Sequence, residues 1–426
     1  MGARSSPGPT WGGLLVGAYL FCVASFSSAE GSFLLLIPQI VAALLVGYAL
    51  YDILSRFAIR IPAEIGFYAL LGLWAAFTRF IGSGVGLTPA LGTLLKIVVA
   101  ALACAQLIKT ESDLLMALRI FVCSIFVVFI QNMGDLGYLS TMGQITEDDR
   151  FAGTLLNANT AAIFALTIIW TSVVLLLRSG RSLWRWAWYA LPIGLALVIV
   201  YYSGSKKGLI GLALLAVFVT RLWYKRQAQT LLRKGLVVLA SAALILIVGY
   251  FIYTSPFFFR MQQLFQGVTN ASDMARWDLA RDAIDVWLKN GKAFFFGVGY
   301  DNFWMFSSLG TYAHSTPLEL LASCGLIGVS LFLAFLGLLI RKFVRLYRTA
   351  ADPDDKSFFF AIDIFLGIYT FFMAAAVLHD AKELIPILAC LAGFGGRELR
   401  LQAEAAAEAA RDAALSAGEP SVEEEG

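Results

Sequence analysis

Two histidines are the first candidates for proton transfer in this chain, His314 and His379. An imidazole titrates near neutral pH, so a histidine at the surface of a membrane protein can act as a general base. His314 stands immediately before an apolar segment, in the sequence Tyr312-Ala313-His314-Ser315-Thr316. We expect His314 to be catalytic, and a packing or interface role is the alternative for a lone histidine.

Lys206 and Lys207 stand where other basic residues are rare. They follow a glycine turn in Ser203-Gly204-Ser205-Lys206-Lys207-Gly208, directly before an apolar segment that predicts a helix. A glycine turn with cations at a helix N-terminus suits a phosphate or pyrophosphate group. Snorkelling of the lysines to lipid phosphates is the other interpretation. We expect both lysines to bind substrate.

An amphipathic helix is predicted over residues 273–287. Its expected apolar face, which would lie at the membrane surface, is formed by Trp277, Ala280, Ile284 and Trp287. Arg281 can pair with Asp278 and Asp285 at helical spacing, and is expected to be structural. Arg276 begins the helix, where a positive charge opposes the helix dipole unless an anion is near. We therefore expect Arg276 to bind an anionic ligand.

Arg150 and Lys96 are weaker substrate-binding candidates. Lys96 lies inside an apolar segment without an acidic partner in sequence, so we expect it to face an internal cavity and hold an anionic lipid headgroup. Arg150 follows Glu147-Asp148-Asp149, whose carboxylates could hold a hard divalent cation. A solvated acidic turn explains that cluster more simply, so we expect neither a metal nor a cofactor.

The elements that position these residues are apolar helices. The chain is 59% hydrophobic and 14% charged, with a mean hydropathy of +0.76, far from the composition of soluble domains. These values predict an all-α polytopic membrane protein with about twelve transmembrane helices. The expected spans are 11–29, 32–54, 63–81, 89–108, 113–133, 159–178, 186–203, 208–224, 235–254, 316–340, 358–378 and 384–396. The first is expected to remain uncleaved.

Lysines and arginines in alternate loops orient these spans, because basic loops remain in the cytoplasm. The basic loops contain Arg56, Arg60, Lys109, Arg178, Arg221, Arg341 and Arg345, and Arg397 and Arg400 follow the last span. The opposite short loops hold Arg79 and Lys382. Both termini are thus expected in the cytoplasm, and segments 134–158 and 255–315 on the periplasmic or extracellular side.

Three regions follow from this topology. A transmembrane domain is expected over residues 1–400. It includes a large, partly helical outer loop at 255–315, between the ninth and tenth helices. An Ala/Glu-rich cytoplasmic tail is expected over 401–426.

Four local patterns on the outer side resemble the O-antigen ligase and O-antigen polymerase superfamily of bacterial membrane glycosyltransferases. One is His314-Ser315 followed after nine residues by Gly325-Leu326-Ile327-Gly328. The second is Arg276-Trp277 with the turn Gly297-Val298-Gly299-Tyr300-Asp301-Asn302-Phe303. The third is Ser203 to Gly208, with Lys206 where the family has arginine. The fourth is Arg150-Phe151-Ala152-Gly153 through Asn157-Ala158-Asn159, with alanine where the family has proline.

The resemblance implies metal-independent transfer of a glycan from undecaprenyl diphosphate to an acceptor hydroxyl, at the outer face of the bacterial inner membrane. His314 would take the hydroxyl proton, and Arg276 and Lys206 would stabilise the diphosphate. The implied partners are the lipid-linked glycan, membrane lipids, and either lipid A-core or a second lipid-linked glycan. No nucleic acid is expected. Stacking faces for sugars are expected from Trp277, Trp287, Phe303 and Trp304, with membrane anchoring as the alternative.

The acceptor distinguishes two enzyme activities. A ligase transfers the finished glycan to lipid A-core, whereas a polymerase transfers it to another lipid-linked repeat unit. The resemblance implies a ligase first, with a polymerase as the alternative, and the short segment from Arg276 to His314 weakens the ligase assignment relative to the polymerase. A lipid-linked glycan flippase or other transporter is the alternative from another class, but the two halves of the chain show no repeat.

Overall fold

The computed structural model describes residues 8–26, 33–83, 88–141, 151, 157–178, 183–227, 249–250, 253, 258, 271–374 and 384–418. Throughout these residues the regular structure is helical. The elements are α1 (Trp11–Phe26), η1 (Phe33–Leu35), α2 (Leu36–Arg56), α3 (Ala63–Ser83), α4 (Pro89–Leu107), α5 (Glu111–Val122), α6 (Ser124–Gln131), α7 (Met133–Thr141), α8 (Ala158–Arg178), α9 (Leu183–Ser203), α10 (Lys206–Gln227), α13 (Ala271–Leu288), α14 (Gly291–Phe296), η3 (Phe303–Met305), α15 (Thr316–Thr349), α16 (Pro353–Met373) and α17 (Leu384–Gly418).

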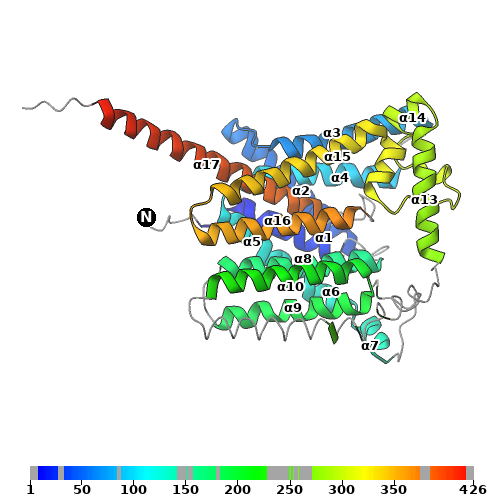
Figure 1. The fold of residues 1–426 in the computed structure, drawn as a ribbon, viewed down its shortest axis with the longest axis horizontal. Coiled ribbons are helices and arrows are strands. Elements are labelled where there is room, and N and C mark those ends of the chain that lie inside the picture. The colour runs from blue at the N-terminus through cyan, green and yellow to red at the C-terminus, as the bar shows by residue number, and fades with distance from the viewer. Residues whose placement is uncertain are drawn as a thin grey trace, which may run out of the picture.

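Most of the long helices run side by side in one bundle, and α13 crosses one end of it (Figure 1). In the described part of the chain, eight helical stretches are long and apolar enough to cross a bilayer: α2, α3, α4, α5 with α6, α8, α9, α15 and α16. The shorter α1 is also apolar. The chain is therefore a polytopic membrane protein, as its composition predicts.

The predicted count of twelve spans is not confirmed. Helices α10 and α17 occupy the predicted spans 208–224 and 384–396, but neither is among the eight. Helix α17 is apolar only at its beginning and continues as a charged helix to Gly418. The predicted span 235–254 lies almost entirely outside the described residues.

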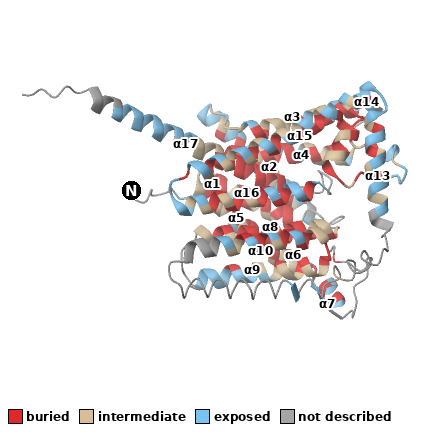
Figure 2. Ribbon diagram, viewed as in Figure 1, coloured by how far each residue is buried: buried red, intermediate tan, exposed pale blue. Residues whose placement is uncertain are grey.

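Buried residues concentrate in the middle of the bundle, where α8 and α16 pack together (Figure 2). Trp170 of α8 stacks on Phe365 of α16 at a centroid distance of 4.2 Å, and its indole Nε1 donates to the Ala361 carbonyl at 2.8 Å. Small residues allow closer approach elsewhere, as in many membrane bundles. A Cβ at Gly13 of α1 would lie 2.8 Å from the Cα atom of Asp113 in α5.

The predicted basic loops share one end of the bundle. Arg178, at the end of α8, pairs with Glu111 of α5 at 2.8 Å and with Asp355 of α16 at 2.7 Å. Arg56, Arg60, Lys109, Arg397 and Arg400 line one pocket there. We call this the basic end. The opposite end carries α13, α14 and η3 (Figure 1), and we call it the loop end. The cytoplasmic location of the basic end stays a prediction.

The described part of the large loop is folded, and α13 packs on it through another face than the apolar stripe expected at the membrane surface. The side chains that it buries against the loop are Leu279, Ala283 and Val286, in a cluster with Phe303, Ala313 and Ala322. Trp277 is 79% exposed and Ile284 is 41% exposed. Both stripes have helical spacing, so the period alone could not decide which one faces the protein. The outward stripe remains available for the membrane or a ligand.

Candidate functional site

His314 lies at the loop end, in the connection between η3 and α15. Its backbone has a φ of 51°, in the left-handed region that non-glycine residues rarely occupy. The Tyr312 ring lies 4.3 Å from the imidazole, centroid to centroid. Ser315 is the N-cap residue of α15, and Pro317 stands in the first helical turn. A strained backbone held by its surroundings is frequent at active sites, which supports a functional role for His314.

Glu319 holds this strained connection, and the sequence analysis did not assign it a role. The carboxylate is buried, and its Oε2 accepts from the backbone N–H of Ala313 at 2.9 Å. Its Oε1 accepts from the Ser323 hydroxyl at 2.9 Å. Glu319 thus ties the residue before His314 to the first turns of α15. An acidic residue in a first helical turn is commonplace, so its type and position alone gave no signal.

Helix α15 is broken at Gly325, which has a φ of 66°. The break frees the carbonyls of Ala322 and Ser323, and these accept from the N–H groups of Val298 and Gly299 at 2.9 Å each. The next carbonyl, of Cys324, accepts from the indole of Trp74 at 2.9 Å. The two glycine patterns of the sequence are therefore one structural unit, in which N–H groups of the first pattern hydrogen-bond to carbonyls just before the second. We call it the glycine contact.

The glycine contact admits no side chain at two of its positions. A Cβ at Gly297 would lie 2.3 Å from the carbonyl carbon of Ser323, and a Cβ at Gly325 would lie 2.3 Å from that of Phe295. Gly297 also has a φ of 72°. The phenylalanine that ends the first pattern, Phe303, is fully buried. These residues set where α14, η3 and the His314 connection lie relative to α15.

Arg79 is a further residue of this unit. It was expected in a short loop of the outer side, but it is a buried residue of α3. Its Nη1 donates to the carbonyls of Tyr300 and Asp301 at 3.2 and 3.3 Å, and to the side-chain oxygen of Asn302. Arg79 therefore fixes the turn that follows the glycine contact. Burial also raises the pKa of Tyr300 well above its usual range, so its hydroxyl stays neutral.

The other two sequence patterns also meet. Gly204 has a φ of 53° and turns the chain between α9 and α10. The Ser205 hydroxyl donates to Asn159 Oδ1 at 2.8 Å, and the N–H of Phe151 donates to the Tyr202 carbonyl at 3.0 Å. We call this the serine contact. Arg150 and the acidic cluster 147–149 lie outside the described residues.

Lys206 and Lys207 open α10 directly after this turn, as predicted, and both are half-buried. Helix α16 ends between the two contacts. A Cβ at Gly211 of α10 would lie 3.4 Å from the ring of Phe372, and the Thr316 hydroxyl lies 3.7 Å from the sulfur of Met373. Helix α10, which the lysines begin, and the start of α15, which follows His314, therefore both contact the end of α16.

Arg276 and Trp277 reach the loop end on α13. Arg276 lies in the second turn, because the helix begins at Ala271 and not at residue 273 as predicted. Its predicted position at the helix start is therefore wrong, and the dipole argument for it weakens. Asp282, later in α13, accepts from the backbone and hydroxyl of Ser308 at 2.7 Å each, which ties the helix to the loop. Arg281 forms no ion pair with the described acidic residues, contrary to expectation.

Other predicted side chains are distributed differently from expectation. Lys96 is exposed on the outside of α4, so it does not face an internal cavity. Phe303 is buried and offers no stacking face. Trp287 stacks on Phe294 at 4.8 Å and donates to its carbonyl. Trp277 and Trp304 remain exposed. Among the residues with described positions, no three metal-binding side chains of His, Cys, Asp or Glu come together.

Comparison with known proteins supports the resemblance in the second half of the chain. The O-antigen ligase family model matches residues 191–333, which include Lys206, Arg276, His314 and both sides of the glycine contact. A comparison with curated proteins found no significant match. The matched family implies a glycosyltransferase-like membrane enzyme. Residues 191–333 are thus similar to the O-antigen ligase family, and the resemblance of the chain to the O-antigen ligase and polymerase superfamily is confirmed.

Proposed function

We propose that this protein transfers a glycan from undecaprenyl diphosphate to an acceptor hydroxyl at its loop end. The observation that carries the proposal is His314 itself, held in a left-handed conformation by Glu319 beside the glycine contact. A general base must be presented in one fixed geometry, and this connection provides it. The expected setting is the periplasmic face of the bacterial inner membrane.

In the proposed reaction, His314 accepts the proton of the acceptor hydroxyl. The acceptor oxygen forms a bond to the anomeric carbon of the donor sugar, while the bond from that carbon to the phosphate oxygen breaks. Undecaprenyl diphosphate leaves with the bonding electrons. Arg276 and Lys206 would stabilise the charge on the diphosphate, and Lys207, Arg150 and Trp277 would assist binding. This charge stabilisation by protein cations makes the proposed transfer independent of a metal ion.

A transfer assay with purified protein and lipid-linked glycan tests the role of His314. His314→Ala should lose about 100-fold or more of the transfer rate, the usual contribution of a positioned base. The variant should keep the thermal unfolding temperature of the wild type to within a few degrees. A normal rate in a folded His314→Ala protein would reject the catalytic assignment.

Arg276 and Arg281 form a matched pair for testing the leaving-group role, since both lie on α13. Arg276→Ala should lower the transfer rate about 100-fold, as expected when one donor to a developing anion is removed. Arg281→Ala removes the same charge from an exposed position of the same helix and should transfer normally. Equal losses in both variants would show that only the charge of α13 matters.

A ligase is our first choice and a polymerase the second, and the matched family supports the function that the two share. The acceptor separates them in a deletion strain. A ligase deletion leaves the acceptor without polymer while lipid-linked polymer accumulates, whereas a polymerase deletion leaves single repeat units on the acceptor. Product formation by purified protein in detergent, where no compartments exist, would reject the flippase alternative.

A further inference from the structure

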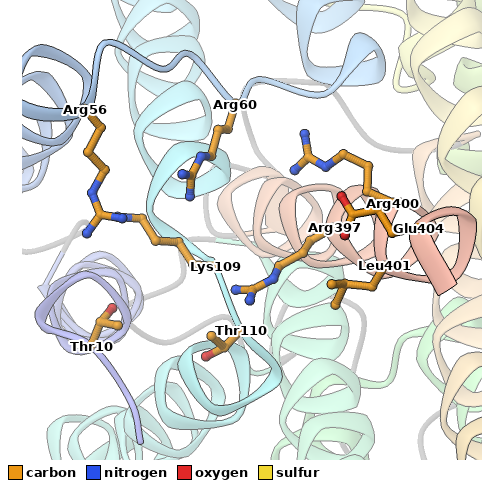
Figure 3. A pocket seen from close by; sticks show the side chains of 9 residues that line it. All are labelled: Thr10, Arg56, Arg60, Lys109, Thr110, Arg397, Arg400, Leu401 and Glu404. Carbon is orange, nitrogen blue, oxygen red and sulfur yellow. The ribbon is translucent and has the colours of Figure 1, made fainter. Parts of the chain in front are cut away.

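The basic end contains a pocket of about 510 Å³ that lies at the opposite end of the bundle from His314. Four separate parts of the chain form it: the residue before α1, the end of α2 with the residues after it, the α4–α5 connection and the middle of α17 (Figure 3). Five of its nine lining residues are cations. The lining consists of Thr10, Arg56, Arg60, Lys109, Thr110, Arg397, Arg400, Leu401 and Glu404.

The first wall, which carries Arg60, is fixed by buried polar groups. The backbone N–H of Arg60 donates to Gln106 Oε1 at 2.7 Å. The Gln106 amide in turn donates to the Ala58 carbonyl and to Asp52 Oδ2, each at 3.1 Å. Phe57 takes a φ of 49°, so the chain turns sharply after α2. The position of Arg60 is thus determined by the interior of the bundle.

The second wall is fixed by Asp113, a fully buried residue of α5. Its Oδ1 accepts from the N–H of Thr10 at 2.7 Å. Its Oδ2 accepts from the N–H groups of Lys109 and Thr110 at 3.1 and 3.0 Å. One carboxylate therefore holds the start of α1 and the α4–α5 connection together at the rim of the pocket.

The third wall is α17, which packs tightly against the bundle just before its arginines. A Cβ at Gly393 would lie 2.6 Å from the carbonyl oxygen of Ala105 in α4. The ammonium group of Lys342 donates to the Ala392 carbonyl at 3.1 Å. This close packing places Arg397 and Arg400, one and two turns later, beside the pocket (Figure 3).

The charges of the pocket are not balanced by its own residues. Asp52 pairs with Arg56 at 3.1 Å and also with Lys109. Arg60, Arg397 and Arg400 form no ion pair with any described acidic residue, including the nearby Glu404. Three arginines around one concave space repel one another unless an anion lies between them. Guanidinium groups are also the side chains best suited to bind phosphate in two-point contacts.

The positive-inside bias accounts for basic residues near the ends of spans. That bias does not require arginines from separate segments to line one pocket. Here the segment of Arg60 is anchored by the buried Gln106, and the helix that carries Arg397 and Arg400 is anchored by the close packing of Gly393 on α4. We propose that this pocket binds a phosphate-bearing anion through Arg60, Arg397 and Arg400. The phosphate belongs either to the headgroup of an anionic phospholipid or to a small soluble molecule. This proposal does not depend on the activity of the loop end.

Thermal unfolding of the full-length protein in nanodiscs tests the proposal with two kinds of probe. One series adds inorganic pyrophosphate to nanodiscs of phosphatidylcholine. The other replaces part of the phosphatidylcholine with phosphatidylglycerol or cardiolipin. A ligand that binds only the folded protein raises its unfolding temperature. The test variant is R60Q/R397Q/R400Q, and the control R341Q/R345Q/R348Q removes three exposed arginines of α15 outside the pocket.

We expect the wild type and the control to be stabilised by at least one probe. Loss of each arginine should weaken phosphate binding about tenfold, so the test variant should show no shift. Stabilisation by pyrophosphate identifies a soluble phosphate, and stabilisation by anionic lipid alone identifies a headgroup. Equal shifts in the test and control variants, or no shift in the wild type, would overturn the proposal. A cooperative unfolding transition of the test variant without ligand confirms that it is folded.

Discussion

The glycine contact and the serine contact both join two distant segments at the loop end, but the serine contact adds a side-chain hydrogen bond to its main-chain one. In the glycine contact, main-chain N–H groups meet the carbonyls of a broken helix. In the serine contact, the link between the two segments includes a hydroxyl and a side-chain amide, Ser205 to Asn159. Two main-chain segments that hydrogen-bond directly leave no room for a side chain between them, whereas a bond between two polar side chains can be replaced by another polar pair.

This difference explains what each sequence pattern specifies. The glycine patterns specify an absence of side chains, because a Cβ added at Gly297 or Gly325 would lie 2.3 Å from the opposing main chain. The serine pattern specifies donors and acceptors. The His314 connection lies in the chain between the two segments of the glycine contact, so its geometry should be far more sensitive to substitution than that of Lys206.

The largest expected effect comes from Gly297→Ala. The added Cβ clashes with the main chain of Ser323, and the alanine must also keep a left-handed backbone conformation. Together these effects cost about 2–5 kcal/mol. The fraction of folded protein and the unfolding temperature should fall, and transfer should be lost. Size-exclusion chromatography and thermal unfolding measure this.

Gly310→Ala is the matched control for that prediction. Gly310 has a φ of 63°, but no atom lies within 4 Å of its Cβ position. Only the left-handed conformation is then penalised, by about 1–2 kcal/mol. If both alanine variants lose stability equally, the close approach of the two segments is not what makes the glycine contact sensitive.

An intermediate effect is expected from Glu319→Ala. The substitution leaves the N–H of Ala313 and the Ser323 hydroxyl without their acceptor, at a cost of about 1–3 kcal/mol for each buried group. Released from Ala313, the His314 connection should relax, so the transfer rate falls more than the affinity for the donor. Ser323→Ala keeps the Ala313 bond and should retain most activity. A smaller rate loss in Glu319→Ala than in Ser323→Ala would contradict this positioning role.

The smallest effect is expected at the serine contact. Ser205→Ala removes the hydrogen bond to Asn159 and the one that the hydroxyl accepts from the N–H of Gly208, and should lower stability by about 1–2 kcal/mol, with a modest loss of donor binding. Ser357→Ala, which removes an exposed local bond to the Pro353 carbonyl, is the control and should change stability by less than about 0.5 kcal/mol. Complete inactivation by Ser205→Ala would show that the serine contact is as sensitive to substitution as the glycine contact.

Hydropathy predicted the helices well because it reports how apolar a segment is along its length. The predicted spans coincide with helices wherever the described residues include them in full. It could not show that α15 is interrupted at Gly325, since an isolated glycine inside a span is compatible with a continuous helix. Nor could it choose between the two apolar stripes of α13, because the choice depends on Phe303 and Ala322 from other elements.

The sequence predicted those residues of the candidate site whose charge or motif is unusual at its position. His314, Arg276 and Lys206 were singled out because their types are unusual at their positions. Arg79 and Glu319 were missed because an arginine and a glutamate near a helix end are ordinary in sequence. Their importance comes from the main-chain groups that they hold, 221 and six residues away in the chain. Such partners become visible only when the fold is assembled.

Helix α17 is longer than a membrane is thick. Its 35 residues extend about 50 Å at the rise of an α-helix, whereas the hydrocarbon core of a bilayer is about 30 Å thick. The final turns therefore project beyond the bundle (Figure 1). A fluorescent reporter fused after this helix would stand clear of the protein body. Its signal would report the side of the membrane on which the basic end lies, without disturbing either end of the bundle.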